Sequence, residues 1–582
     1  MSKDWRICAE TPLEFKQEMS AYHPLMAQLL YNRGLINQNQ ITSFFNPNYE
    51  AVHDPFLFVD MKKAVERIWR AVESKEKILI HGDYDADGVT SAAVLFKALK
   101  VVGADVNVFI PHREIDGYGL NLNSVNNFCV QEIKLLITVD CGITNVVEIA
   151  ALNQAGIDVI ITDHHQPPLI LPNAFATLDP KVDNCGYPFS GLSGAGVAFK
   201  LAQAIFSDLR IENFNSALLS SGGSKGFLKW LLDIVAIGTV ADVSPMIDEN
   251  RILVKWGLVV LRQTRNLGLK ELLETMSAKK IDSYTIGFQI APRLNAAGRM
   301  NHASAAFELL IAEDADRAKQ LALDLQKNNS ERQKAIEGAI ATARLQVTEQ
   351  LGNRIIFVYD ENWLPGLIGL IAGKICDEHY RPVLAMTKSN DKILGSGRSV
   401  PEFDITSELT LVSEFLARFG GHKQACGFTL AALELFDKFK TSLAIQAENK
   451  LVGIELTPFL NIEAEIEVEK MTVELAEKIN EFSPFGENNP IPLFVLKNLQ
   501  IVAMNALGNQ STHLRLTVRK NNSRSYKLLF FSQAEKYLKI LQPGDTIDAV
   551  CELGVNEWNG QREVEFKGVD LKLVIKQEEQ DK

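Results

Sequence analysis

The sequence predicts an α/β protein that continues into a C-terminal β-domain. Helical patterns alternate with short, β-rich apolar runs from about residue 60 to 165 and again from 354 to 450. This alternation is typical of a mostly parallel sheet covered by helices. Between residues 303 and 351 there is no proline and one glycine, which favours helix. Strand-length segments separated by turns follow a short helical pattern near residues 470–482, so we expect a small, barrel-like β-domain at the end of the chain.

Four apolar runs in the first α/β pattern have the length and composition of buried strands: Lys77–Ile80, Val106–Ile110, Leu135–Val139 and Val159–Thr162. A fifth run, Leu232–Gly238, follows loop-like residues at 220–226. Its pattern does not distinguish helix from strand. The second α/β pattern opens with a strand-like run at Arg354–Tyr359.

A long helix is expected to begin near Asp314. If it is continuous to about residue 350, it spans roughly 55 Å at 1.5 Å per residue, which is longer than a typical domain radius. Such a helix can connect two domains. The domains expected from these patterns are an N-terminal segment (1–60), a first α/β domain (61–302), a connecting helical region (303–351), a second α/β domain (352–453), a β-domain (454–575) and a solvated tail (576–582).

Composition and charge exclude several classes of protein. The chain has 582 residues, of which 46% are apolar and 23% charged, as expected for a folded protein of several domains. Its net charge of −12 argues against a protein that coats nucleic acid by charge alone. Seven scattered cysteines without a C-x-x-C pair argue against a disulfide framework or a thiolate zinc site. With no signal peptide or membrane-spanning stretch visible, we expect a cytoplasmic protein without a membrane role.

Acidic and imidazole side chains follow the apolar runs. The first strand leads into His81, Asp83, Asp85 and Asp87, the third ends at Asp140, the fourth ends at Asp163, His164 and His165, and the 232–238 run reaches Asp242. Ligands of parallel sheets bind at the carboxyl ends of the strands. Taken alone, each group has an ordinary structural explanation as a solvated turn or a histidine pair. Their recurrence at the same end of four segments favours a common ligand-binding site.

Clustered carboxylates require a compensating positive charge, because at about 4 Å each pair repels by several kcal/mol at an effective dielectric near 20. Asp85, Asp87, Asp140 and Asp242 would be neutralised by two divalent cations. Mixed aspartate and histidine ligands suit manganese or magnesium. Two such ions can position an attacking hydroxide and stabilise a phosphoryl transition state. The predicted chemistry is therefore phosphoester hydrolysis.

The motifs DYDADG, VDCGIT, TDHH and GTVADVSPM occur in this order and resemble the four motifs of the DHH phosphoesterase superfamily. Within it, the chain is similar end to end to a family of bacterial single-strand-specific exonucleases. Further matches are YNRGL, IPHREIDGYGLN, APRLNAAGRM, GSGRS, GGHKQACGF and SPFGENNPIPLF. The resemblance implies a DHH parallel-sheet domain and a DHH-associated α/β domain joined by a long helix, plus a C-terminal OB-like barrel.

The resemblance also implies roles for individual residues. One metal would be held by His81, Asp85 and Asp140, and the other by Asp87, Asp140, His164 and Asp242, with Asp140 bridging. Asp83 belongs to the same motif and is a candidate for the catalytic group. His165 would face the substrate phosphate, where it either stabilises an oxygen or protonates the leaving group; the sequence does not decide between these roles.

Candidate nucleic-acid ligands come from the remaining motifs. By resemblance, Arg113, Ser396 and Arg398 would receive a 5′ phosphate, and His422 would lie near the scissile end. The residues Arg293, Asn295 and Arg299 match a motif that contacts the DNA strand. Glycines in GSGRS and GGHKQACGF let backbone N–H groups approach an anion, and arginine offers a planar fork for phosphate. Each of these residues also has an ordinary alternative in turns, caps and salt bridges.

The β-domain carries a local basic patch. Residues 501–550 contain seven Lys or Arg against three Asp or Glu. The alternation of apolar and basic residues after His513 places Arg515 and Arg519 on an expected exposed face. Tyr526, Phe530 or Phe531 are candidates for base stacking, as in OB-folds that bind single strands. A solvated strand face over an aromatic core is the alternative.

The predicted function is a two-metal 5′-to-3′ exonuclease that releases mononucleotides from single-stranded DNA in repair and recombination, with the polarity resting on resemblance alone. One alternative is a related phosphoesterase acting on short oligoribonucleotides or a nucleotide bisphosphate, which would not need the third domain. The other is a non-catalytic replication scaffold, which loss of metal ligands would mark. By resemblance, the expected partners are single-strand binding protein and a helicase.

Overall fold

The computed structural model describes residues 3–208, 210–211, 222–278, 280–508, 510–521 and 524–574. The predicted tail at 576–582 and the start of the predicted loop at 220–226 lie outside these residues. The chain forms two compact units: residues 49–456 with 486–488, and residues 1–48 with 457–485 and 489–582. Among the described residues, no helix is both long and apolar enough to cross a membrane.

The first sheet of the larger unit is parallel throughout, with the strand order β3-β2-β4-β5-β6. Its strands are β2 (Lys77–Gly82), β3 (Asp105–Phe109), β4 (Leu135–Val139), β5 (Asp158–Thr162) and β6 (Ala176–Leu178). The four predicted strands are confirmed. The three-residue strand β6 was not predicted, because so short a run carries little pattern of its own.

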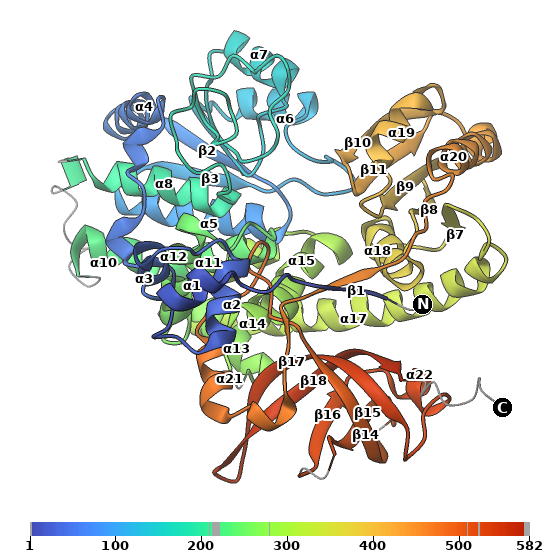
Figure 1. Ribbon diagram of the computed structural model, residues 1–582. Helices are drawn as coiled ribbons and strands as arrows, with labels where there is room; N and C mark the ends of the chain where they lie inside the picture. The colour runs from blue at the N-terminus through green and yellow to red at the C-terminus, as the bar shows by residue number, and fades with distance from the viewer. Residues whose placement is uncertain are drawn as a thin grey trace. The chain divides into compact units, whose positions relative to one another are not determined.

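Helices cover both faces of this sheet (Figure 1). One face packs on α4 (Met61–Glu73), α5 (Ala86–Val101) and α8 (Gly194–Phe206), and the other on α6 (Leu122–Val130) and α7 (Val146–Gln154). The alternation along β2 shows why: Ile78 and Ile80 join the first core, whereas Leu79 joins the second. Strands of a sheet that is buried on both faces have nearly continuous apolar sequences, as the predicted strands do.

The ambiguous run at 232–238 is helical. It lies in α11 (Leu232–Ala241), where residues 232–239 are all buried. A helix buried on every side loses the 3.6-residue alternation that normally identifies it. Asp242 is therefore delivered by the C-cap of a helix and not by a strand end. The same helical region contains α10 (Gly223–Trp230), α12 (Asp248–Leu261), α13 (Leu267–Met276), α14 (Ser283–Thr285), the π-helix η4 (Ile286–Ile290), α15 (Ala291–Met300) and α16 (Ser304–Ile311).

Asp233, in the first turn of α11, provides a test of this packing by pH. It is buried and accepts hydrogen bonds from the Thr264 hydroxyl and the Ile234 N–H. Burial nevertheless raises its pKa to about 6. A carboxyl group with a raised folded-state pKa stabilises the fold while protonated, and this contribution is lost as pH rises from about 4 through about 6.

We therefore expect Asp233→Asn to gain stability relative to the wild type by about 1 kcal/mol between pH 5 and pH 8. Urea unfolding of both proteins at the two pH values measures this difference, since every other titrating group is shared. Parallel pH profiles for the two proteins would show that Asp233 ionises in the folded state as readily as in water.

The long helix is continuous. Asp314 caps α17 (Ala315–Thr348), a helix of 34 residues that spans about 51 Å. Leu321 and Leu325 in its first half belong to the core of the parallel-sheet domain, whereas Ala343 and Val347 near its end belong to the core of the following domain. The prediction of a helix that connects two cores is confirmed.

The second α/β domain has a mixed sheet with the strand order β10-β11-β9-β8-β7. The elements are β7 (Ile356–Tyr359), α18 (Ile368–His379), β8 (Val383–Ser389), β9 (Lys392–Arg398), α19 (Ile405–Leu411), β10 (Leu416–His422), β11 (Ala425–Leu430) and α20 (Phe436–Lys450). Only β7 and β8 are parallel to one another, and the other neighbours are antiparallel. The GSGRS and GGHKQACGF motifs lie on the adjacent strands β9, β10 and β11.

The smaller unit is built around a closed five-stranded barrel in which β14 pairs with both β15 and β17. The barrel strands are β14 (Phe494–Leu507), β15 (His513–Arg519), β16 (Tyr526–Phe530), β17 (Thr546–Trp558) and β18 (Gln561–Leu573), with α22 (Ala534–Leu538) between β16 and β17. Before the barrel come β12 (Phe459–Ile462), β13 (Ala464–Glu465) and α21 (Val473–Asn480). The barrel prediction is confirmed.

The first residues of the chain fold with this barrel. Strand β1 (Asp4–Ile7) pairs in parallel with β12, and α1 (Leu13–Glu18), α2 (Pro24–Asn32) and α3 (Gln38–Phe45) follow it. Phe15, Leu29 and Ile41 share one buried core with barrel residues such as Phe494. A truncation that removes only the C-terminal residues would leave this N-terminal core without its partner.

Candidate active site

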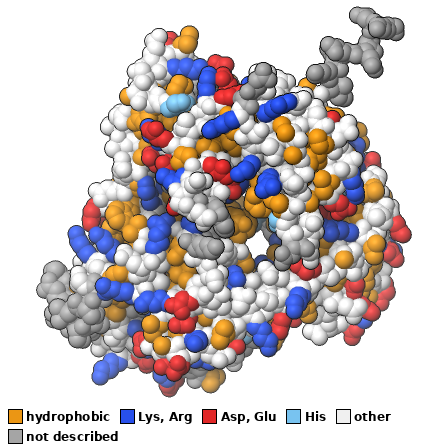
Figure 2. Space-filling model, turned by 90° about the horizontal axis from the view of Figure 1, so that it is seen from below, with side chains coloured by type: hydrophobic (Ala, Val, Ile, Leu, Met, Phe, Trp, Pro, Cys, Tyr) orange, Lys and Arg blue, Asp and Glu red, His pale blue; other side chains and the backbone are white. Residues whose placement is uncertain are grey.

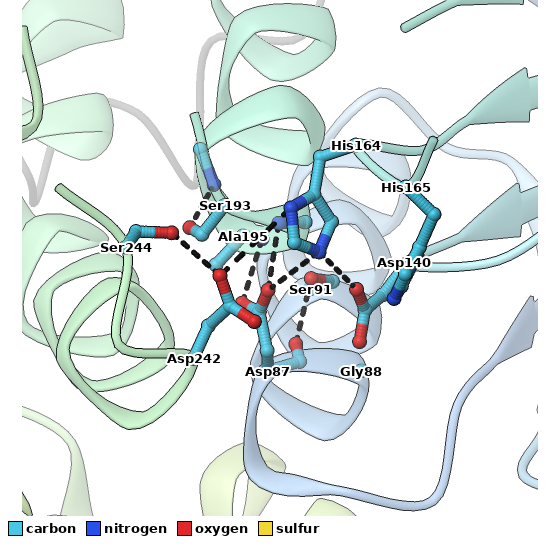
Figure 3. Close-up of polar contacts among 12 residues, drawn as sticks. Asp87, Gly88, Ser91, Asp140, His164, His165, Ser193, Ala195, Asp242 and Ser244 are labelled. Atoms are coloured by element: carbon cyan, nitrogen blue, oxygen red, sulfur yellow. Dashed lines mark hydrogen bonds and ion pairs between the residues drawn. The ribbon is translucent and has the colours of Figure 1, made fainter. Parts of the chain in front are cut away.

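The carboxyl ends of the strands in the parallel sheet hold a buried cluster of aspartates and histidines (Figure 3). Three overlapping groups each bring their ligand-type atoms within 4.8 Å of one another: Asp83, Asp85 and Asp140; Asp87, His164 and Asp242; and Asp140, His164 and His165. Asp140 and His164 each belong to two of these groups. Seven of the eight residues predicted for this centre are therefore brought together, and His81 is treated separately below.

His164 lies between three carboxylates. Its Nε2 is 2.9 Å from Asp140 Oδ1 and 3.8 Å from Asp87 Oδ2, and its Nδ1 is 3.8 Å from Asp242 Oδ2. Burial and the neighbouring His165 lower the pKa of His164 to about 3, so the ring is neutral and its nitrogens are available as ligands.

The backbone around the cluster places each carboxylate. Asp85 caps α5 by accepting from the N–H groups of Asp87 and Gly88. The side chain of Asp87 accepts from Gly194 N at 2.7 Å and Ala195 N at 2.9 Å, so it binds the first turn of α8. A Cβ on Gly194 would come within 2.6 Å of the Asp140 side chain, so glycine is needed for this close approach.

Asp140 itself has a strained backbone, with φ at 60°. A non-glycine residue in the left-handed region costs free energy, and such strain concentrates at functional sites. The conformation is held by a hydrogen bond from Asp140 N to Thr162 O at 3.0 Å. It turns the carboxylate toward His164 at the end of β5.

Repulsion among the buried carboxylates of the cluster favours bound cations. Burial and repulsion from neighbouring carboxylates raise the pKa values of Asp83, Asp87 and Asp140 well above their usual range. Burial raises the pKa of Asp242 to about 6, although it accepts from Ser244 Oγ at 2.5 Å. Divalent cations would remove this repulsion.

The residues present fit such cations on a second ground. Among the described residues, Asp83 Oδ1 is buried without a hydrogen-bond partner, and both ring nitrogens of His81 are buried, with an interaction to the backbone of Gly119. Buried polar atoms are almost always paired, so unpaired ligand-type atoms beside a carboxylate cluster indicate ions. His81 follows the apolar part of β2 and stacks on Phe109, but it is in none of the three groups above.

His165 is held by Asp163, a residue to which the sequence assigned no individual role. Asp163 Oδ1 lies 2.7 Å from His165 Nδ1 and also accepts from the His164 and His165 N–H groups, while its Oδ2 accepts from Ile143 N. Burial alone would lower the pKa of His165, but the hydrogen bond and charge of Asp163 raise it to about 9. The ring is therefore protonated at neutral pH and partly exposed.

Two further residues near His165, Tyr118 and Asp179, were not predicted from the sequence. The Tyr118 hydroxyl lies 3.1 Å from His165 Nδ1 and donates to Asp140 O at 3.3 Å. Asp179, directly after β6, is fully buried, and burial raises its pKa to about 7. Tyr118 could have been found from the sequence, because it lies in the quoted IPHREIDGYGLN motif, whereas Asp179 follows the three-residue strand β6, which is too short to be recognised by pattern.

The residues predicted to contact the DNA strand form side-chain hydrogen bonds within the protein. Asn295 accepts from Ala86 N at 2.9 Å, so its side chain holds the start of α5 beside the aspartates. Arg293 donates to Gln326 Oε1 and Gln289 O, and Arg299 donates to Gly366 O at 3.1 Å. Neither arginine is paired with a carboxylate among the described residues.

The predicted phosphate pocket is assembled in part. Arg398 Nη1 donates to Ser396 Oγ at 3.2 Å, and a Cβ on Gly369, in the first turn of α18, would lie 3.1 Å from Ser396 Oγ and 3.3 Å from Arg398 Nη2. Arg113 stacks over Tyr84 at 4.8 Å. The side chain of His422 is exposed on the edge strand β10. The helix N-terminus beside Ser396 and Arg398 favours an anion.

On the face shown in Figure 2, Lys and Arg side chains are interspersed with Asp and Glu among the described residues. That face therefore does not present a uniformly basic surface. In the barrel, a cavity of about 610 Å³ lies against β15, β16 and β18 and includes Arg515, Arg524, Lys527 and Arg562. Arg519 is exposed and donates to Gln500 Oε1.

The stacking candidates of the barrel divide by exposure. Tyr526 and Phe530 are 8% and 0% exposed, because alternate residues of β16 point into the barrel core, whereas Phe531 is 49% exposed. Phe530 is therefore a core residue, and its proposed stacking role is wrong. Phe531 remains accessible and packs edge-on against His513.

Comparison with known proteins agrees with this architecture. Family models match residues 77–239 (DHH family, N-terminal domain), 352–448 (DHHA1 domain) and 462–570 (RecJ OB domain). The fold and the aspartate and histidine cluster thus define a DHH-type protein with a metal-binding site.

Two curated relatives are both named single-stranded-DNA-specific exonuclease RecJ. The one from Bacillus subtilis is 38% identical over 93% of this chain and 66% of its own length. The one from Haemophilus influenzae is 31% identical over 94% of this chain and 95% of its own. The chain belongs to the RecJ family of single-stranded-DNA-specific exonucleases.

Solved structures of RecJ from Thermus thermophilus have the same fold. The complex with Mn²⁺ superposes with a TM-score of 0.81 at 28% identity, covering 98% of this chain and 79% of that one. The complex with Mg²⁺ has a TM-score of 0.75 at 27% identity, covering 98% and 78%.

Proposed function

We propose that this chain is a 5′-to-3′ exonuclease that uses two divalent cations, Mn²⁺ or Mg²⁺, to release mononucleotides from single-stranded DNA. The observation that carries the proposal is the set of overlapping ligand groups that share Asp140 and His164. One group, with Asp83 and Asp85, suits the first cation, and the other, with Asp87 and Asp242, suits the second. Such ions supply Lewis-acid charge stabilisation for phosphoryl transfer. His81, whose ring is fully buried near the end of β2, remains a proposed ligand of the first.

The residues around the cluster have separate proposed tasks. Asp163 fixes the orientation of His165, whose protonated and partly exposed ring can donate a hydrogen bond to a phosphate oxygen or a proton to the leaving oxygen. Ser396, Arg398 and the first turn of α18 form a set of donors suited to a terminal phosphate. Arg113 and His422 remain proposed additions to that set.

The barrel is proposed to hold the strand. Its cavity is lined by four Lys or Arg side chains, by Tyr526 and Phe566 and by three glutamates, so its lining carries a small net positive charge beside aromatic surface. Arg515 lines the cavity and has no ion-pair partner among the described residues, which supports a ligand role. Arg519 and the exposed Phe531 are proposed contacts on the barrel surface. Single-strand binding protein and a helicase remain expected partners on the family resemblance alone.

The function is tested by incubating the protein with Mn²⁺ or Mg²⁺ and end-labelled single-stranded DNA, duplex DNA and short RNA. Release of a labelled mononucleotide first from 5′-labelled single strands is the expected result. Initial release from the 3′ end would overturn the polarity. A preference for di- or triribonucleotides would instead place the chain with the oligoribonucleotide phosphoesterases.

Arg398→Ala is expected to lower the preference for 5′-phosphorylated over 5′-hydroxyl strands by about 10-fold, because it removes one charge-assisted hydrogen bond. Initial rates on the two substrates measure the ratio. Arg381→Ala is a matched control, since Arg381 lies in the same domain and donates to the carbonyls of Asn353 and His379. An unchanged ratio in the Arg398 variant would assign the GSGRS strand a structural role.

A further inference from the structure

The connecting helix α17 carries an arginine that no motif identified. Arg332 lies in the middle of this helix and is partly buried. Its Nη2 donates to the side chain of Asn329 at 2.9 Å, and Asn329 is itself 2% exposed. The Nε of Arg332 is buried without a hydrogen-bond partner, and no ion pair of Arg332 occurs among the described residues.

The surroundings of Arg332 are basic. Helices α15 and α17 pack together, and Arg293 of α15 is tied to α17 through Gln326. Burial and the charge of Arg332 lower the pKa of Arg293. Burial, together with Arg113, Arg332 and Arg398, lowers the pKa of Arg299 to about 9. Arg299 is therefore exposed to the positive charge of three arginines on other elements.

Close backbone packing connects the segment around Arg299 both to the aspartate cluster and to the strand with Ser396 and Arg398. The loop at residues 83–85, which we call the aspartate loop, contains Tyr84. A Cβ on Gly298 would lie 2.8 Å from Tyr84 O, and a Cβ on Gly366 would lie 2.7 Å from Arg299 O. Gly369, one turn further along, contacts Ser396 and Arg398. The Gly298–Arg299 segment therefore packs closely against both Tyr84 and Gly366, and the charge of Arg332 on α17 acts on Arg299.

Partly buried guanidinium groups that repel one another are stabilised by a nearby anion, and Asp85 supplies part of that negative charge to Arg299. Asn329 orients the guanidinium of Arg332 through Nη2, and no carboxylate pairs with Arg332 among the described residues, so its charge is available to a phosphate.

We propose that Arg332 binds a backbone phosphate of the single strand, so that the connecting helix is part of the substrate-binding surface. This inference rests on the proposed function and adds a residue to it. It assigns α17 a role in holding DNA as well as in joining the two cores.

The test compares the wild type with Arg332→Ala and Arg332→Lys in initial rates on long single-stranded DNA at several salt concentrations. Arg344→Ala is the matched control, because Arg344 is on the same helix but is paired with Glu378 at 2.6 Å. Hydrolysis of bis(p-nitrophenyl) phosphate with Mn²⁺ reports on the metal centre alone. We expect Arg332→Ala to raise KM for DNA about 10-fold, to flatten the log-log salt dependence by about 0.7, and to leave the small substrate unaffected.

Arg332→Lys keeps the charge and loses the fork, so it is expected to retain the salt dependence with a smaller rise in KM. The inference is wrong if Arg332→Ala has the KM and salt dependence of Arg344→Ala. It is also wrong if hydrolysis of DNA and of the small ester fall equally, since that result assigns Arg332 to the structure of the centre. Failure of the proposed function is seen separately, as wild-type protein that does not degrade single strands.

Discussion

Asp140→Ala is expected to lower kcat by about 10³-fold or more, the largest effect of any single substitution in the chain. Removing one group that stabilises a transition state typically costs 10²–10³-fold, and Asp140 belongs to two ligand groups at once. Its carboxylate is also 2.9 Å from His164, so the variant loses the contact that orients a second ligand. The strained backbone at Asp140 indicates that this placement matters enough to be maintained at a cost.

The measurement is Mn²⁺ stoichiometry alongside turnover. Asp105→Ala is the control, since Asp105 is exposed at the opposite, amino end of β3 in the same sheet. His81→Ala is expected to lose less activity than Asp140→Ala, because His81 lies outside the three ligand groups. An Asp140 variant that bound two ions and turned over near the wild-type rate would remove this residue from the proposed centre.

Asp163→Asn is expected to lower kcat by about 10- to 100-fold with little change in KM, the usual range for residues that orient a functional group. The carboxylate accepts four hydrogen bonds, two of them from the side chain and backbone of His165. An amide has only one accepting oxygen, so its NH₂ group would face at least one of these donors. His165 would then lose both its orientation and the charge that keeps it protonated.

Asp158→Asn separates this effect from a general loss of stability. Asp158 lies at the other end of the same strand, where it pairs with Arg67 and Arg70, so its substitution should cost stability and spare turnover. The metal content of the Asp163→Asn variant shows whether Asp163 acts through His165 or through His164. If Asp163→Asn loses its ions together with its activity, Asp163 acts through the neighbouring His164 and not through His165.

Local pattern was enough to predict much of this molecule. The strands at 77, 106, 135 and 159 were recognisable because each is a short apolar run bounded by turn residues. The helix beginning at Asp314 was recognisable from its cap and from the lack of breakers, and the aspartates and histidines from their positions directly after apolar runs. Ordered motifs then supplied the family.

The rest could not be read locally. The run at 232–238 is helical because it is surrounded by other elements, and burial on every side erased its periodicity. The first 48 residues fold with the C-terminal barrel because Phe15, Leu29 and Ile41 complete its core, although more than 400 residues separate them in sequence. Phe530 and Phe531 are adjacent in sequence, but Phe530 ends β16 with its side chain in the barrel core, whereas Phe531 lies in the following turn and is exposed.

The sequence by itself therefore determined the fold class, the family and the set of chemically able residues, since these depend on residue types and their spacing along the chain. Only the tertiary structure decided which residues act together. Asp163 orients His165, Asn295 holds the aspartate loop, and α17 with Arg332 packs on α15 with Arg299, because contacts between distant elements are set by packing. Charge burial and unpaired polar atoms likewise arise only when the chain is folded, since solvent satisfies every such group in the extended chain.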